Sequence, residues 1–367
     1  SMVYKITTSA EGIYRIDRDF ILAQGLTAGE IDDIDLEELR LFNRGAEVAI
    51  NVFDEATAGQ LDAGDYIEFY AQNNYDAYFK YTTDNIYWLT LSGGAGLAKR
   101  MAVDDGAPAA GELGIDFIDT VHHEQDIIYW LKAPGADSIE RWFFGTFVQG
   151  DQHSGGGVPK AFTIAVPEPL SNGTLTISMA GQTATGHAVE VVANGASATV
   201  YWSGIAYYEA TVDNVPLFAG DNTVTLQCLS ADGNDSIAVD YFKITYRRDY
   251  VAGADDTLKF EPDNGSRYLI DGFSADTLAA YDISDPADVM QIADYAVTGP
   301  DGDGNFSIDF EPASGGDTYY VLTSDAVYAP DALTEDTASS LFDTALSLIH
   351  ISEPTRLRRK SRMPSSA

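Results

Sequence analysis

The chain has 367 residues, enough for two or three domains that each bury a core. Its net charge is −36, although five of its 21 basic residues lie in the last twelve positions. So acidic a body repels nucleic acid and anionic membranes. Solubility is the favoured explanation of the charge, which also suits a secreted protein in salty water or one that binds divalent cations. A single cysteine excludes an intrachain disulfide framework and a cysteine-based zinc site. No apolar run reaches the roughly 18 residues that a membrane-spanning helix needs.

Residues 1–113 are predicted to form a first β-rich unit with short helices. Alternating, strand-like runs recur through it, for example over 12–16 and 65–70. One short helix is expected over 17–23. A second is expected to begin after Thr27, because Glu30 three residues on completes a capping box.

Residues 114–250 are predicted to form a central antiparallel β-sandwich, similar to a jelly roll. Apolar residues alternate with small or polar ones throughout 159–246, and Gly- and Asn-containing turns separate the runs. The clearest alternation is seen in three runs: Phe162, Ile164 and Val166; Leu175, Ile177 and Met179; Val224, Leu226 and Cys228. Because Cys228 shares the phase of its apolar neighbours, we expect it to be a buried core residue without catalytic function.

The central region also contains a possible metal-binding run, in which His122 and His123 precede Glu124 and Asp126. Adjacent residues of a strand point to opposite faces, so the two histidines are not expected to share one ion. A plain strand is the favoured interpretation.

Three aromatic residues of the central region, Trp202, Tyr207 and Tyr208, are candidates for a stacking platform that binds a sugar. The favoured interpretation is that they fill the core and the strands, since Trp202 alternates in phase with Val200.

Residues 251–330 are predicted to form a third, small β domain. Within it, Asp301, Asp303 and Asn305 place three oxygen-bearing side chains at alternate positions, like the opening of a calcium loop. Phe306 and Pro312 stand where such a loop requires glycine and glutamate. A plain hairpin turn is therefore favoured, with calcium as the one possible cofactor.

The end of the chain changes character twice. Residues 331–346 are predicted to form a linker helix capped near Thr334. Residues 347–367 are basic and unrelated to the acidic body, and they resemble translated sequencing-adapter read-through at the end of a metagenomic reading frame. We expect this tail to be non-native, to lie outside the fold and not to bind nucleic acid, which would make the chain a fragment.

Taken in order over residues 4–346, several strings resemble the non-catalytic N-terminal region of gingipain-like cysteine peptidases. These are secreted proteins that include the sortase of type IX secretion. The matching strings are 11–15 (EGIYR), 39–45 (LRLFNRG), 47–50 (EVAI), 64–70 (GDYIEFY), 123–126 (HEQD), 141–143 (RWF), 220–226 (GDNTVTL) and 281–286 (YDISDP).

The resemblance implies a structural, prodomain-like or presenting role, because the family's catalytic His and Cys lie in a downstream α/β domain. No His–Cys pair in this chain matches that motif, so no catalytic residue is assigned and no peptidase activity is expected. The implied partners are the downstream catalytic domain and, on the cell surface, a glycan or the secretion machinery. An extracellular or surface location is expected. The alternatives are a carbohydrate-binding module and a structural adhesion protein.

Overall fold

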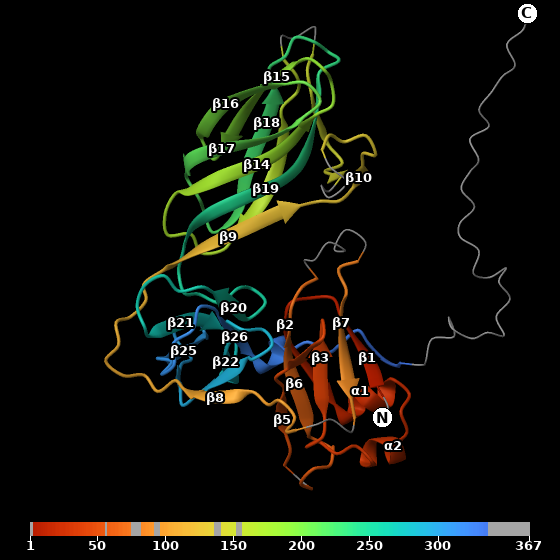
Figure 1. Ribbon diagram of the computed structural model, residues 1–367. Helices are drawn as coiled ribbons and strands as arrows, with labels where there is room; N and C mark the ends of the chain where they lie inside the picture. Colours follow the sequence, from red (N-terminus) through yellow and green to blue (C-terminus); the bar gives the residue numbers. More distant parts are fainter. Residues whose placement is uncertain are drawn as a thin grey trace, which may run out of the picture.

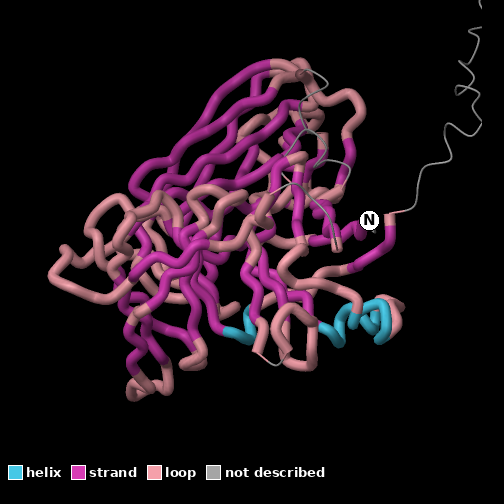
Figure 2. The backbone as a smooth tube through the Cα atoms, turned by 60° about the horizontal axis from the view of Figure 1, so that its bottom comes forward, coloured by secondary structure: helices cyan, strands magenta, loops and turns pink. Residues whose placement is uncertain are grey.

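The computed structural model describes residues 3–55, 57–74, 82–91, 96–135, 141–151 and 156–336. The fold is mainly β, as predicted, and consists of three units of packed sheets (Figure 1). Helices are confined to short segments near one edge of the molecule, whereas strands run through all three units (Figure 2). Among the described residues, no helix combines the length and the apolar character needed to cross a membrane.

The N-terminal unit comprises residues 3–101 together with 332–335. It contains a five-stranded sheet, in the order β27-β1-β7-β3-β4, and a three-stranded sheet, in the order β2-β6-β5. Its core is aliphatic and aromatic and receives side chains from both sheets. The strands are β1 (Val3–Thr8), β2 (Gly12–Asp17), β3 (Arg40–Asn43), β4 (Ala46–Val48), β5 (Asn51–Phe53), β6 (Tyr66–Ala71), β7 (Asn85–Thr90) and β27 (Ala332–Glu335).

The two predicted helices are present as α1 (Arg18–Ala23) and α2 (Ala28–Asp32). Asp17 caps α1, because its carboxylate accepts a hydrogen bond of 2.7 Å from the backbone N–H of Phe20. Thr27 and Glu30 form both bonds of the capping box that the sequence predicts for α2.

The prediction of a linker helix over 331–346 is wrong for residues 332–335. Residues 332–335 form β27, which pairs antiparallel with β1, and Leu333 is buried in the N-terminal core. The open edge of β1 supplies backbone partners that an isolated helical turn lacks, so tertiary pairing overrides the local capping signal. Residues 337–346, and the tail from 347 to 367, lie outside the described residues.

The sandwich comprises residues 117–248. One sheet has the order β12-β19-β14-β17, with β9 also on β19, and the other has the order β13-β18-β15-β16. The alternating apolar residues meet between these sheets, as predicted. The strands are β9 (Phe117–Glu124), β10 (Ile128–Tyr129), β11 (Trp142–Phe143), β12 (Phe147–Gln149), β13 (Lys160–Val166), β14 (Gly173–Gly181), β15 (Gly186–Ala193), β16 (Ala196–Ser203), β17 (Tyr207–Val215), β18 (Gly220–Cys228) and β19 (Ser236–Arg248).

The third unit comprises residues 102–116 and 249–331. Its sheets have the orders β20-β26-β22-β23-β8 and β21-β25-β24. The elements are β8 (Ala102–Asp105), β20 (Thr257–Phe260), β21 (Tyr268–Phe273), β22 (Leu278–Asp282), β23 (Met290–Ala293), β24 (Ala296–Thr298), β25 (Phe306–Phe310), β26 (Tyr319–Thr323) and a 3-10 turn over Ser324–Ala326.

Strand β8 belongs to the third unit, although the sequence placed residues 102–105 in the first. It pairs in parallel with β23, about 190 residues later in the chain, a partnership that local sequence cannot reveal. The sandwich is therefore an insertion between β8 and β20 of the third unit, joined to it by two chain crossings (Figure 1).

The N-terminal and third units share a core. Ile13 and Tyr70 from the former pack with Tyr281, Val289 and Leu322 from the latter in one buried cluster. Backbone hydrogen bonds cross the same boundary, including Arg15 N–H to Tyr328 C=O at 2.8 Å and Ala49 N–H to Ala287 C=O at 3.0 Å. These two units thus form one packed base, from which the sandwich projects.

Candidate functional site

The single thiol lies in a buried polar cluster at one end of the sandwich. Cys228, at the end of β18, donates to Asp235 Oδ2 at 3.3 Å, and His187 Nδ1 on β15 lies 2.6 Å from Asp235 Oδ1. Thr183 adds a third hydrogen bond to the same carboxylate, at 3.3 Å. Cys228 and Asp235 are fully buried and His187 is 2% exposed, so the core position predicted for Cys228 is confirmed.

This cluster is not arranged as a nucleophile with its base. The carboxylate stands between thiol and imidazole, each of which contacts a different oxygen of Asp235. Burial, followed by the hydrogen bond to Asp235, raises the pKa of Cys228 to about 11, which leaves almost no thiolate at neutral pH. The geometry suits a structural network that satisfies buried polar groups.

A second polar cluster lies on the outer face of the sandwich. His122 and Glu124 of β9 are 2.8 Å apart, and Asp240 of β19 accepts a hydrogen bond of 2.8 Å from Ser178. Burial, aided by the charge of Glu124, raises the pKa of Asp240 to about 6, and burial also raises the pKa of Asp126.

The two adjacent histidines do point to opposite faces of β9, as predicted. His122 packs against Tyr241 with ring centroids 4.8 Å apart, whereas His123 packs against Phe144 at 5.6 Å. No group of three or more potential ligand side chains in the described part of the chain is arranged to hold a metal ion.

The three candidate sugar-binding aromatics do not form one platform. Trp202 and Tyr208 stack face to face, with ring centroids 5.1 Å apart and an interplanar angle of 5°, and both pack at the margin of the sandwich core. Tyr207 turns to the other face of β17 and stacks on Phe143 at 6.0 Å. Trp202 also covers His187, at 4.7 Å.

The candidate calcium residues lie in the turn between β24 and β25. Asp301 Oδ1 accepts hydrogen bonds from the backbone N–H groups of Asp303 and Asn305, each at 2.9 Å. These bonds, that from Asn305 foremost, lower the pKa of Asp301. The carboxylate thus closes the turn, which agrees with the favoured hairpin interpretation.

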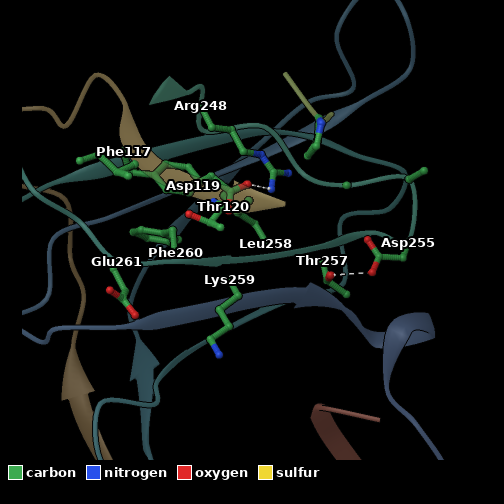
Figure 3. Close-up of a pocket in the computed structure, with 14 residues that line it drawn as sticks. Phe117, Asp119, Thr120, Arg248, Asp255, Thr257, Leu258, Lys259, Phe260 and Glu261 are labelled. Carbon is green, nitrogen blue, oxygen red and sulfur yellow. Dashed lines mark hydrogen bonds and ion pairs between the residues drawn. The ribbon is translucent and has the colours of Figure 1, made fainter. Parts of the chain in front are cut away.

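A cleft of about 610 Å3 separates the sandwich from the third unit. It is lined by Phe117, Asp119 and Thr120 of β9 and by Leu258 and Phe260 of β20 (Figure 3), and Phe117 and Phe260 pack together in the core beside it, with ring centroids 5.8 Å apart. The volume is within the usual range of ligand pockets, and such pockets often occur between domains.

The charges in this cleft are largely neutralised in pairs. Arg248, at the end of β19, binds Asp119 at 2.9 Å and the carbonyl of Val251 at 3.2 Å. Lys259 binds Glu11 of the N-terminal unit at 2.5 Å.

Sequence reasoning missed Asp235, Asp240 and the cleft. Asp235 follows a turn-rich run in which aspartates are ordinarily exposed, and Asp240 has the same alternating phase as many surface acids. The cleft combines strands that are more than 130 residues apart. No local signal distinguishes any of the three.

No protein-family model matches the sequence, and no curated protein matches it. Among solved structures, the fold is similar to that of dimeric latent PorU from Porphyromonas gingivalis, with a TM-score of 0.64, 15% sequence identity and coverage of 92% of this chain. This chain spans 33% of that PorU chain.

Carbohydrate-binding modules match a smaller part of the chain. The module CBM36 in complex with calcium and xylotriose has a TM-score of 0.24 at 17% identity, covering 34% of this chain and 98% of its own. The module CBM35 from Cellvibrio japonicus Abf62 has a TM-score of 0.26 at 20% identity, covering 34% of this chain and 92% of its own.

Proposed function

We propose that this chain is the non-catalytic N-terminal part of a secreted gingipain-like cysteine peptidase, and that it holds and presents a downstream catalytic domain outside the cell. The fold similarity to PorU extends over 92% of the chain and so includes all three units. That extent supports the proposal more strongly than a match to one sandwich would.

The observation that carries the presenting role is the return of the chain to its own first strand. Strand β27 pairs with β1 over four residues, and the next backbone N–H, that of Asp336, donates to Val3 C=O at 2.8 Å. The N-terminal unit is in turn fixed to the third unit by their shared core. Whatever follows residue 336 would therefore start from a fixed point on a packed base.

The chain's own residues support the absence of peptidase chemistry in this part. Peptide hydrolysis through a thiol needs a thiolate, a base in contact with it and access for the substrate. Cys228 is buried, its pKa is raised to about 11 and its polar partner is a carboxylate.

The test compares this chain with a longer one that includes the coding sequence downstream of residue 346. We expect that sequence to contain an α/β domain with a His–Cys pair, and the longer chain to hydrolyse casein or Arg- and Lys-ended fluorogenic peptides. The present chain should not hydrolyse them. Turnover by this chain that disappears in Cys228→Ala would refute the proposal.

The presenting role has a separate test in the longer chain. Leu333→Asp places a charge in the N-terminal core and should detach β27, lowering peptidase activity or making it depend strongly on temperature. Thr334→Asp is the matched control, since it adds the same charge at the neighbouring exposed position of β27. Equal activity of the two variants would rule out presentation through β27.

A further inference from the structure

The cleft between the sandwich and the third unit is bordered by two sheet margins. Among the strands that the structure describes, β20 pairs only with β26 and β9 only with β19. The lining of the cleft includes two consecutive runs, 117–120 from β9 and 257–260 from β20. Successive side chains of a strand point to opposite faces of the sheet, so a strand that faced the cleft would line it with every second residue only. Because consecutive residues line the cleft, each strand presents its edge to it.

The hydrogen-bond pattern shows which groups of β20 point into the open edge. Thr323 N–H donates to Asp256 C=O at 3.2 Å, and the register continues as Thr257 opposite Leu322. Along antiparallel strands, every second residue directs its backbone N–H and C=O to the neighbouring strand. Leu258 and Phe260 therefore direct these groups to β26, whereas Lys259 directs its N–H and C=O away from β26, to the open edge of the sheet.

The neighbouring residues of β20 agree with this assignment. The outward C=O of Thr257 is taken by Gly253 N–H at 2.8 Å, whereas within the described chain nothing bonds the outward backbone groups of Lys259. On the opposite side, Asp119 bonds the N–H of Thr120 at 2.7 Å. One outward donor of β9 is therefore occupied, whereas β20 offers the N–H and the C=O of Lys259 to the cleft.

Charge indicates what kind of segment fits this edge. Both cations of the cleft, Arg248 and Lys259, are already paired with carboxylates. Asp255 and Glu261 flank β20 and have no cationic partner among the described residues. The protein as a whole carries a charge of −36, which adds to the attraction for a basic segment.

We propose that the edge of β20 binds an extended, basic segment of another polypeptide, which adds to the sheet as a further strand in the cleft. Backbone hydrogen bonds to Lys259 provide the register, as in other strand-addition complexes. Basic side chains of the segment pair with Asp255 and Glu261. This inference does not depend on the presence of a catalytic domain.

The binding test uses fluorescence anisotropy with the full chain and a blocked, fluorescein-labelled probe, Lys-Thr-Val-Thr-Val-Thr-Lys. We expect saturable binding that is at least about tenfold weaker when both lysines are replaced by glutamate. N-methylation of alternate amides provides a second comparison on the ligand side. One alternate set should abolish binding and the other should not, because only one edge of an added strand faces β20.

The decisive protein variants are Lys259→Pro and Lys259→Ala. Both remove the ammonium group and its pair with Glu11, but only proline removes the outward N–H. Proline is tolerated on an open edge because that N–H takes no part in the ladder, so the two variants should have similar melting temperatures. We expect Lys259→Pro to bind the probe at least about tenfold more weakly than Lys259→Ala.

Three results would overturn the proposal. The first is equal probe binding by the proline and alanine variants. The second is equal binding of the lysine and glutamate probes. The third is a concentration-dependent dimer, measured by analytical ultracentrifugation, that Lys259→Pro dissociates, since a second copy of this chain would then be the occupant of the edge.

Discussion

At the scale of single residues, burial rather than residue type decides the behaviour of the acidic groups. This chain has 57 Asp and Glu residues, and most of them could not be told apart in the sequence. Asp235 lies fully buried with three donors, whereas Asp240 is partly buried beside other acids and has a raised pKa. Each environment arises only when strands distant in sequence come together.

Asp240 predicts a pH-dependent stability difference. Its pKa is about 6 in the folded chain, against about 3.9 when unfolded. The folded state therefore binds more protons between pH 4 and 6, and stability falls as pH rises through that window. At pH 7 we expect the free energy of unfolding of Asp240→Asn to exceed that of the parent by about 1–2 kcal/mol. The variant should therefore unfold at a higher urea concentration.

That difference should shrink as the pH falls towards 4, where the parent carboxyl is also neutral. Asp221→Asn, at an exposed site on β18, serves as the control and should leave stability nearly unchanged at both pH values. A constant offset between Asp240→Asn and the parent across this range would contradict the assignment.

We expect the thiol of Cys228 to be unreactive until the sandwich opens. Because it is buried and its pKa is raised to about 11, Ellman's reagent at pH 8 should label the native chain only at its rate of opening. In denaturant, one thiol per chain should react at once. Native labelling at the rate of a free thiol would show that the cluster with Asp235 is open to solvent.

At the scale of elements, short segments form as predicted wherever their partners are local. Helix α2 follows the capping box of Thr27 and Glu30, and the turn from Asp301 to Asn305 joins neighbouring strands. Where the partner is distant, the local signal fails. Thr334 looks like a helix cap, yet its segment pairs with β1 at the other end of the chain.

In the turn between β24 and β25, we expect Asp301 to stabilise the fold through hydrogen bonds and not through bound calcium. Asp301→Ala removes the acceptor of two backbone N–H groups and should lower the melting temperature. The calcium interpretation requires in addition that millimolar CaCl2 raise the melting temperature of the parent and not that of Asp301→Ala. We expect neither protein to respond, and Asp303→Ala to be nearly neutral.

At the scale of the whole molecule, the order of units in space differs from their order in sequence. The base combines residues 3–116 with 249–336, and the sandwich is inserted between them. Contacts at the insertion lie near the two crossings: Arg247 pairs with Asp116 at 3.0 Å and Asp263 at 2.7 Å, and Phe117 of β9 packs in the core of the third unit. The sandwich has a core of its own, separate from that of the base.

This arrangement predicts two thermal transitions in calorimetry. Phe242→Ala in the sandwich core and Ile283→Ala in the shared core of the base each remove a buried side chain, at about 2–5 kcal/mol. Each should lower only its own transition. A single transition that both variants lower equally would mean that the sandwich and the base unfold together.

The sequence by itself determined the mainly β class, the alternation that builds the sandwich, the two capped helices and the inward position of Cys228. All of these follow from period-two burial or from bonds between residues a few positions apart. Only the tertiary structure decided that β8 and β27 pair across the chain, that Asp235 separates Cys228 from His187, and that Trp202 and Tyr207 face different ways. Those outcomes depend on which strand edges meet, and the free energy of such long-range pairing is not encoded in any local pattern.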